Sequence, residues 1–489
     1  MIPAPGAAVR RGEVRLLFPL LFSYCVAVIA VTGMYPIFAL FTHVSNDFGE
    51  GWNAYWAKAV QRGLPLYSAS RTFTANNYPP LSFYANAALG GLIGDNIFAG
   101  RLIALASMIG VAALIAWIVA RLGAPRRWAG MAATLFLLYN LVYLRQMVAV
   151  DNPQWLGEMV GLASILPLIS RPTLTLRNKD VIVAAAIMVS AGLVKHNQFA
   201  LPLAVTVWLL LFDRRALLTW CLSGACFAGA ACAVLYGLYG QAVFIEILHF
   251  QRTMSPTTFK SGLMKSGLFL PMIGFAAIPL YARRGDARLV LLLLYALFGV
   301  VFGILQRLGS GVYINAYDDA LIGLVTVCGT SLGLAAAGRH RLPLGRSWRA
   351  LLLLVLLAPI ILVTPKHVRQ SIADLRDLGR QEDIWKTMIA TVRDARGPVL
   401  CELPSVCYWA GKPLVIDFFA YGQKLHLGAD PAPLHDMVAK RRAAVIVVDR
   451  QVETSQAERR LPPPFPDLID SGYRVATQAA NHVATMVPR

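Results

Sequence analysis

The stretch "SNDFGEGWNAYWAKAV" (45–60) places two acids, Asp47 and Glu50, three positions apart directly after a long apolar run. On a helix, residues three apart are neighbours, so the two carboxylates share a face. Aromatic residues follow, among them Trp52 and Trp56, as in segments that lie at the level of lipid headgroups. The stretch is either an acidic interfacial loop or part of a functional site.

The composition excludes an ordinary soluble protein. Of the 489 residues, 57% are hydrophobic and 15% are charged, and the mean hydropathy is +0.57. A soluble fold cannot bury that much apolar surface, so a bilayer must surround much of the chain. The net charge is +19, but the basic residues stand in short clusters between apolar runs. We interpret these clusters as topology signals and expect no nucleic-acid partner.

The apolar runs predict an α-helical polytopic membrane protein with about 11 transmembrane helices, each crossing about 30 Å of hydrocarbon. No convincing cleavage site follows the first run, so we expect an uncleaved anchor. The predicted spans lie near 16–41, 99–121, 128–145, 153–170, 181–195, 199–212, 216–240, 267–282, 289–305, 319–337 and 350–364.

Basic residues mark the cytoplasmic side of a membrane protein. They precede the first run and occupy every second connection after it, at Arg10, Arg11, Arg15, Arg121, Arg126, Arg127, Arg171, Arg177, Lys179, Arg214, Arg215, Arg283, Arg284, Arg288, Arg339, Arg341, Arg346 and Arg349. The remaining connections, with the acidic stretch and the tail after residue 365, are therefore predicted to face outward from the cytoplasmic (inner) membrane.

The segment "PPLSFYANAALGGLIG" (79–94) is apolar enough to be taken for a further span. Only about 14 residues follow its prolines, which is short for a bilayer. Counting it as a span would also place every later basic cluster outside. We therefore predict a helix that lies along the outer membrane face.

The tail, residues 366–489, differs in composition from the apolar region 1–365. Strand-like runs at 397–403, 412–417 and 443–450 surround a helical pattern at 431–443. Short buried strands that alternate with helices predict a small extracytoplasmic α/β domain. This domain either recognises an acceptor or serves as a structural cap.

Two cysteines of the tail, Cys401 and Cys407, could form a disulfide if the tail is extracytoplasmic. The small ring that they would close makes the geometry restrictive.

Further charged residues are predicted at the outer rim. "RQMVAVDNPQWLGEM" (145–159) places Asp151 at the mouth of a span, where it serves either as a helix cap or in a site. Glu158 follows about two turns further in, where an ionisable residue is costly and usually functional. In "GLVKHNQFALPLA" (192–204), Lys195 lies between two apolar runs and either extends to the interface or binds an anion.

In their order, these motifs resemble the GT-C fold glycosyltransferases, in particular the bacterial branch similar to protein mannosyltransferases and lipid A aminoarabinose transferases. The resemblance covers about the first 340 residues. Many members carry two adjacent acids, whereas in this chain Gly49 precedes Glu50 and the partner acid is Asp47, so the identity of the base stays open. The matching motifs are the Asp47–Glu50 pair, "NNYPPLSFY" (76–84), "RQMVAVD" (145–151), "VKHNQFALPLA" (194–204) and "GVYINAYDDALIGL" (311–324).

The resemblance implies a hexosyl or pentosyl transfer at the outer membrane face. The donor would be a sugar on a polyprenyl phosphate, such as undecaprenyl or decaprenyl phosphate, and the acceptor a hydroxyl of a glycan, lipid or protein. A single displacement would invert the anomeric centre. A carboxylate would accept the proton of the acceptor hydroxyl. We expect Asp47 to be this base, with Glu50 as the second choice, and Asp151 either to orient the acceptor or to hold a second hydrogen bond.

A cation would stabilise the charge that develops on the departing phosphate. We expect Lys195 in this role, followed by Arg145 and Arg307. The segment with Tyr313, Asn315 and Asp318 either contacts the sugar or phosphate or caps a helix.

A donor with one phosphate needs no obligatory metal, although paired acids could hold Mg²⁺ or Mn²⁺. The rival hypothesis is a multi-span transporter or lipid flippase, which should place acids and broken spans near the midplane of related halves. A ligase for preassembled polysaccharide would share the lipid donor but should carry a larger outer loop than 241–266.

Overall fold

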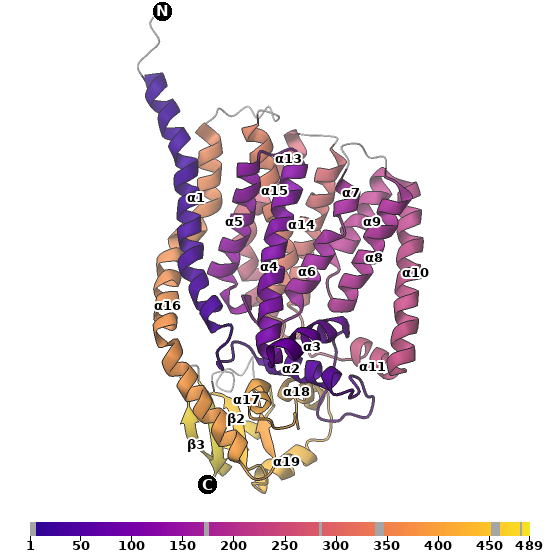
Figure 1. Ribbon diagram of the computed structural model, residues 1–489, viewed down its shortest axis with the longest axis vertical. Helices are drawn as coiled ribbons and strands as arrows, with labels where there is room; N and C mark the ends of the chain where they lie inside the picture. Colours follow the sequence, from indigo (N-terminus) through magenta and orange to yellow (C-terminus); the bar gives the residue numbers. More distant parts are fainter. Residues whose placement is uncertain (1–5, 171–175, 283–285, 338–346, 451–459, 480–481) are drawn as a thin grey trace, which may run out of the picture.

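The computed structural model describes residues 6–170, 176–282, 286–337, 347–450, 460–479 and 482–489. Its main part is a bundle of helices that stand side by side (Figure 1). The bundle consists of α1 (Gly6–Ala39), α4 (Asn96–Arg121), α5 (Arg126–Tyr143), α6 (Gln154–Ala163), α7 (Leu166–Ile169), α8 (Asn178–Val194), α9 (Ala200–Phe212), α10 (Arg214–Tyr239), α13 (Leu270–Ala282), α14 (Ala287–Gln306), α15 (Asp318–Ala336) and α16 (Ser347–Asp394).

Every predicted span falls on helices of this bundle, with 153–170 divided between α6 and α7, and the prediction of a helical multi-pass membrane protein is confirmed. Among the described residues, six helices meet both the length and the composition expected of a membrane span, and α6 with α7 and α9 are shorter apolar helices. The bundle is organised around α15, whose side chains are buried from Asp318 to Ala335. Gly299 of α14 lets the two helices meet, because a Cβ there would lie 2.6 Å from the Ala320 nitrogen.

The helix ends agree with the predicted alternation of basic connections. The carboxyl end of α4 and the amino ends of α5, α10 and α14 lie at the end of the bundle away from the C-terminal domain (Figure 1). Arg121, Arg126, Arg214 and Arg288 occupy these four ends. Other basic residues of the pattern lie outside the described residues or on helix ends whose side chains are not described, namely Arg10, Arg11, Arg15, Arg171, Arg283, Arg284, Arg339, Arg341, Arg346 and Arg349.

Short helices fill the space between the bundle and the C-terminal domain. Among them, α2, α3 and α11 lie across the ends of the long helices (Figure 1). The segment predicted to lie along the membrane forms α3, a helix of 13 residues that packs on α2 and α4. The short elements are α2 (Phe48–Gln61), α3 (Leu81–Ile93), η1 (Arg145–Met147), α11 (Ala242–Leu248), α12 (Pro256–Ser266), η2 (Gly267–Phe269) and η3 (Ile314–Tyr317).

The C-terminal domain is an α/β unit, as predicted. Strands β1 and β2 pair in parallel, and β4 joins β2 and β3 by antiparallel pairing, in the order β1-β2-β4-β3. Leu400, Ile446 and Tyr421 belong to its buried core. Its elements are β1 (Val399–Cys401), α17 (Pro404–Trp409), α18 (Phe418–His426), α19 (Ala432–Ala439), β2 (Val445–Asp449), α21 (Phe465–Gly472), β3 (Tyr473–Gln478) and β4 (Val483–Pro488).

One predicted strand of this domain is wrong. The run 412–417 is an extended segment that leads into α18, not a strand of the sheet. Pro413 removes a backbone donor that a ladder would need. The Asp417 N–H instead donates to the Phe73 carbonyl at 2.9 Å, so the segment binds the loop before α3.

The boundary between the two regions lies within a helix. α16 follows α1 along the bundle and continues into the C-terminal domain (Figure 1). The proposed division at residue 365 therefore falls inside one continuous helix of 48 residues. Because α16 belongs to both regions, it joins them without a linker, although Pro365 at the boundary lacks the N–H that a helix interior normally uses.

Candidate active site

The acidic stretch forms the entry to α2. Asp47 is the N-cap of this helix, and its Oδ1 accepts a hydrogen bond of 2.7 Å from the Gly49 N–H. The side chain is partly exposed. Burial among its neighbours raises the pKa of Asp47 and the Glu50 charge adds to this, whereas the Gly49 N–H and the charges of Arg460 and Lys195 lower it. Asp47 therefore combines a helix cap with a carboxylate that reaches the surface.

Glu50 has a different environment from Asp47. Its carboxylate is fully buried and receives two hydrogen bonds from Arg101 of α4, at 2.7 Å and 2.8 Å. The same guanidinium donates to the carbonyls of Ala39, Thr42 and Val44. Glu50 therefore fastens α2 to α4 and to the turn after α1. Glu50, the second choice for the base, therefore already accepts hydrogen bonds from the protein at its carboxylate oxygens.

Arg101 is a residue that the sequence prediction missed. It lies in the first turns of an otherwise apolar run, and its side chain is 0% exposed. An ionisable residue at such a position is a signal of function or of a buried ion pair. Its partner could not be identified from the sequence, because Glu50 is 51 positions away.

Asp151 lies behind this ion pair, at the start of a small cavity. Its N–H donates to Glu50 at 3.3 Å, and the Asn86 amide donates to both of its carboxylate oxygens at 3.1 Å. Burial raises the pKa of Asp151 well above its usual value, and the Glu50 charge adds to this. Gly100 makes room for the carboxyl group, since a Cβ there would lie 2.0 Å from Asp151 Cγ. Asp151 is therefore held by Asn86 beneath the rim.

Lys195 lies on the same side of the bundle as Asp47. It ends α8, is 4% exposed, and its Nζ donates to the Tyr78 hydroxyl at 3.2 Å and to Asn152 Oδ1 at 3.4 Å. The ammonium also lies 4.4 Å from the Tyr78 ring centre. The ring of Tyr78 in turn packs edge-on against Trp52 of α2, with 5.1 Å between the centroids. Tyr78 therefore connects Lys195 with the helix that Asp47 caps.

Tyr78 and Arg252 complete this group. Burial raises the pKa of Tyr78, but the charges of Lys195 and Arg252 outweigh burial, so the net pKa is lowered. Arg252 lies over the rings of Phe250 and Phe419, 5.9 Å and 5.2 Å from their centres. Within the described parts of the chain, Arg252 forms no ion pair. Arg252 is not among the residues that the sequence motifs assigned to the site.

The other two predicted phosphate ligands, Arg145 and Arg307, contact other groups of the protein. Arg145 pairs with Asp374 of α16 and lies 4.8 Å from the centre of the Tyr35 ring. Arg307 donates to the Val312 carbonyl and packs against Gly262, where a Cβ would lie 2.8 Å from its side chain. Both cations are engaged with the protein in this conformation.

The segment before α15 spreads over the rim and the interior. Tyr313 is 44% exposed, and its hydroxyl interacts electrostatically with Arg460. Asn315 is partly buried in η3. Asp318 is fully buried at the start of α15, and within the described residues neither of its carboxylate oxygens has a hydrogen-bond partner. Of these three residues, Tyr313 is the one that faces the domain carrying Arg460.

Glu158 is directed into the bundle rather than toward the rim. It is 3% exposed and accepts a hydrogen bond of 2.7 Å from Gln154. Asp319 of α15 accepts one of 2.7 Å from Tyr295. These carboxyl groups lie among spans, away from the exposed side of Asp47.

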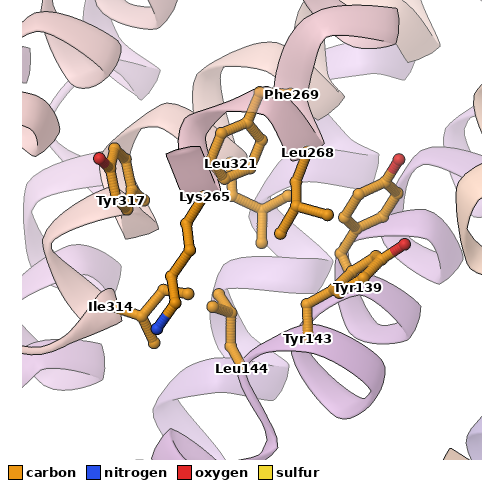
Figure 2. A pocket seen from close by; sticks show the side chains of 9 residues that line it. All are labelled: Tyr139, Tyr143, Leu144, Lys265, Leu268, Phe269, Ile314, Tyr317 and Leu321. Atoms are coloured by element: carbon orange, nitrogen blue, oxygen red, sulfur yellow. The ribbon is translucent and has the colours of Figure 1, made fainter. Parts of the chain in front are cut away.

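A separate apolar cavity lies between α5, η2 and the start of α15 (Figure 2). Figure 2 shows the aliphatic chain of Lys265 extending beside Ile314, with Tyr139 and Tyr143 on the opposite wall. This cavity shares no lining residue with the cavity beside Asp151.

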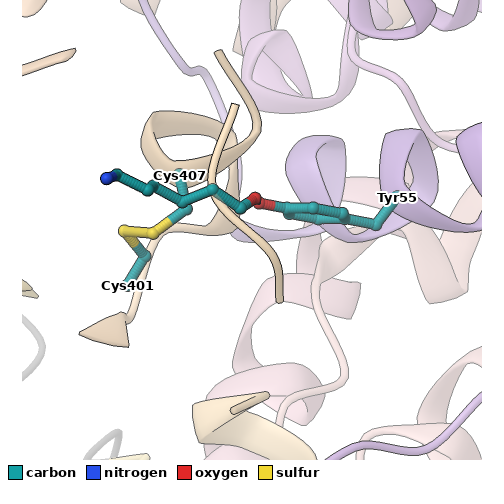
Figure 3. The surroundings of a disulfide bond; sticks show 4 residues. Tyr55, Cys401 and Cys407 are labelled. Carbon is teal, nitrogen blue, oxygen red and sulfur yellow. A yellow bond between two sulfur atoms is a disulfide. The ribbon is translucent and has the colours of Figure 1, made fainter. Parts of the chain in front are cut away.

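The C-terminal domain closes over α2 directly. The Tyr55 hydroxyl donates to the Lys412 carbonyl at 2.5 Å, and the Trp409 indole donates to Asp95 at 2.9 Å. Cys401 at the end of β1 forms a disulfide with Cys407 of α17, on the side of the domain that Tyr55 approaches (Figure 3). The Tyr55 contact holds the domain against α2, which Asp47 caps, and the Trp409 contact holds it against the N-cap of α4.

In the part of the chain that the structure describes, three or more His, Cys, Asp or Glu side chains do not converge in a way that could hold a metal ion. The possibility that paired acids bind Mg²⁺ or Mn²⁺ thus stays a prediction.

Known structures share this architecture, although no family model and no curated protein sequence matches the chain. ArnT from Cupriavidus metallidurans bound to undecaprenyl phosphate is 14% identical, with 95% of this chain and 98% of that chain covered and a TM-score of 0.59. The apo state of ArnT gives a TM-score of 0.60 at 14% identity, covering 95% and 97% of the two chains.

An oligosaccharyltransferase from Archaeoglobus fulgidus in complex with Zn and sulfate is also similar. It is 11% identical, with a TM-score of 0.51, covering 95% of this chain and 73% of that chain. ArnT is a lipid A aminoarabinose transferase of the GT-C type. The chain therefore has the GT-C fold that the order of its sequence motifs implied.

Proposed function

We propose that the protein is a membrane glycosyltransferase that moves a sugar from a polyprenyl-phosphate donor to a hydroxyl acceptor at the outer face of the cytoplasmic membrane. The observation that carries this proposal is the meeting of Asp47 and Lys195 at one rim, joined through Tyr78 and Trp52. A carboxylate with a raised pKa and a buried ammonium are the two groups that such a transfer needs.

In the proposed reaction, Asp47 accepts the proton of the acceptor hydroxyl. The acceptor oxygen forms a bond to the anomeric carbon while the bond from that carbon to the phosphate oxygen breaks, and the electron pair leaves with the phosphate. Of the described residues, the Gly49 N–H is the donor to the Asp47 side chain, through Oδ1. The second carboxylate oxygen is thereby left for the acceptor, and attack opposite to the leaving group inverts the configuration.

Lys195 and Arg252 would receive the phosphate. Both charges act on the Tyr78 hydroxyl, so they face a common point. Lys195 donates to the neutral groups of Tyr78 and Asn152, which a phosphate oxygen can replace with a stronger charge-assisted bond. Asp151 and Glu50 would support the site from below, because Asp151 donates its N–H to the carboxylate that Arg101 holds.

The experiment is a transfer assay with purified protein, a set of defined polyprenyl-phosphate sugars, and lipid, glycan and peptide acceptors. Asp47→Asn should lower the transfer rate by about 10²- to 10⁴-fold, the contribution of a general base. Full activity of both Asp47→Asn and Glu50→Gln would refute the assigned base. Failure of every donor, together with dissipation of a substrate gradient in liposomes, would favour the rival transporter or flippase.

A further inference from the structure

Arg460 connects the C-terminal domain to the first turn of α2. It precedes α21 in sequence, and its side chain is 9% exposed. The ion pair of Arg460 with Glu402 measures 2.6 Å, and Asp449 lies 4.0 Å away. Glu402 follows β1 and Asp449 ends β2, so both anchors lie at the carboxyl ends of two parallel strands.

The backbone of Arg460 is held as firmly as its side chain. Gly422 of α18 packs against it so closely that a Cβ at Gly422 would lie 1.8 Å from the Arg460 carbonyl oxygen. Glu402 also accepts the Asp449 N–H at 2.7 Å. The guanidinium is thus presented in one orientation by β1, β2 and α18.

The far side of this guanidinium faces the acidic stretch. Its central carbon lies 4.7 Å from the centre of the Phe48 ring, and Phe48 is the first residue of α2, directly after Asp47. The Phe48 ring in turn contacts Phe419 of the C-terminal domain, with 6.4 Å between the centroids. A cation over an aromatic face is attracted by the ring and resists displacement. The contact therefore holds the start of α2 against the C-terminal domain.

We propose that the C-terminal domain is a working part of the transferase site, in which Arg460 is a positioning residue that holds the first turn of α2 and supplies the positive charge that keeps Asp47 available as a base. This inference rests on the proposed function. It assigns a role to the C-terminal domain, for which the sequence analysis gave two alternatives, acceptor recognition or a structural cap. Arg460 reaches Asp47 through Phe48 and through its charge, without contacting the reacting atoms.

The charges that act on Asp47 come from three parts of the chain. Glu50 of α2 disfavours the ionised carboxylate, whereas Lys195 after α8 and Arg460 of the C-terminal domain favour it. The Asp47 charge in turn raises the pKa of Tyr78, which lies before α3, although the nearby cations outweigh this effect. Removing the Arg460 charge should therefore raise the pKa of Asp47, and the acidic limb of activity should move to higher pH.

The test measures Asp47 itself as well as turnover. A water-soluble carbodiimide modifies protonated carboxyl groups, and Asp47 is partly exposed. Peptide mass spectrometry across a pH series gives the midpoint of its modification without any substrate. In Arg460→Gln, this midpoint should rise by about half a pH unit or more, because one nearby charge is lost. With an undecaprenyl-phosphate sugar as donor, the acidic limb of kcat/KM should move in parallel.

Two variants separate this role from a loss of folding. Arg460→Gln leaves Glu402 buried without its partner, so the double variant Glu402→Gln/Arg460→Gln replaces the pair with two neutral amides. It should show the same displacement of the midpoint. Arg450→Gln removes a partly exposed arginine of the same domain, paired with Asp470 at 3.4 Å, and should leave the midpoint unchanged.

An unchanged Asp47 midpoint in both Arg460 variants, with the fold intact, would overturn the inference. This result is distinct from failure of the proposed function, which would appear as full transfer by Asp47→Asn in the same assay. Phe48→Leu should lower kcat/KM without moving the midpoint as far, because the charge of Arg460 stays in place.

Discussion

Arg101 encloses the carboxylate of Glu50 with two hydrogen bonds of 2.7 Å and 2.8 Å, and both side chains are 0% exposed. Asp47, three residues earlier, is instead partly exposed and lies at the rim. Asp47 and Glu50, which the sequence places on one face of a helix, therefore have different environments. One is suited to hold the fold and the other to exchange a proton with a substrate.

Glu50→Gln should reduce stability more than Asp47→Asn. The first variant leaves the buried Arg101 guanidinium without a counter-charge, which costs about 3–5 kcal/mol. The second keeps an N-cap, since an asparagine oxygen can still accept the Gly49 N–H. Thermal unfolding in detergent should therefore show a lowered Tm for Glu50→Gln and a Tm near the wild-type value for Asp47→Asn. Equal Tm values for all three proteins would contradict the structural role of Glu50.

Lys195→Met should weaken transfer by about 10²-fold, because the developing phosphate charge loses its nearest ammonium. Donor titrations in the transfer assay, evaluated as kcat/KM, provide the measurement. Lys265→Met is the matched control, since this lysine is exposed and lines the apolar cavity of Figure 2. A comparable loss in both variants would indicate a general effect of positive charge at the membrane surface.

Gly51→Ala should separate α2 from the C-terminal domain. A Cβ at Gly51 would lie 2.0 Å from the Ser405 backbone nitrogen in α17, and backbone cannot move aside as a flexible side chain can. We expect lower activity together with faster proteolysis of the C-terminal domain. Gly91→Ala on α3 is the control, because its Cβ would meet its nearest neighbour, Gln61, at 3.9 Å. Wild-type behaviour of Gly51→Ala would show that the two helices can separate without consequence.

Asp417→Asn should change how stability depends on pH. Asp417 caps α18 by accepting the Ala420 N–H at 2.9 Å, and burial raises the pKa of its carboxyl to about 6. The folded state thus binds a proton more tightly than the unfolded state, so stability falls as pH rises from about 4 to about 6. Above that window the charged carboxylate costs on the order of 3 kcal/mol.

An asparagine keeps the cap and removes this titration. The Tm of Asp417→Asn should exceed that of the wild type at pH 7, and the difference should vanish near pH 4. Asp436→Asn serves as the control, because the Asp436 side chain is 50% exposed and pairs with Lys440, the C-cap of α19. A Tm difference for Asp417→Asn that does not vary with pH would refute the assigned cause.

The helices of the bundle and two strands of the tail follow from local pattern. Long apolar runs predicted the spans, since hydrocarbon leaves a backbone little alternative to helix. Runs such as 443–450 predicted β2, because short β-branched segments fill a buried strand. The run 412–417 also contains Leu, Val and Ile, but Pro413 disfavours a strand there. Its backbone bonds instead to the loop at Phe73, a partner that no local pattern contains.

The sequence by itself determined that this chain lies in a membrane and that the Asp47 stretch and Lys195 belong to the same side of it, because hydropathy and charge act over a single segment at a time. Only the tertiary structure decided which groups meet. Arg101 selects Glu50 over a separation of 51 residues, and the C-terminal domain brings Arg460 to Phe48 from the other end of the chain. The free energy of an ion pair or a ring contact depends on distance in space and on burial, and neither is written in the order of the residues.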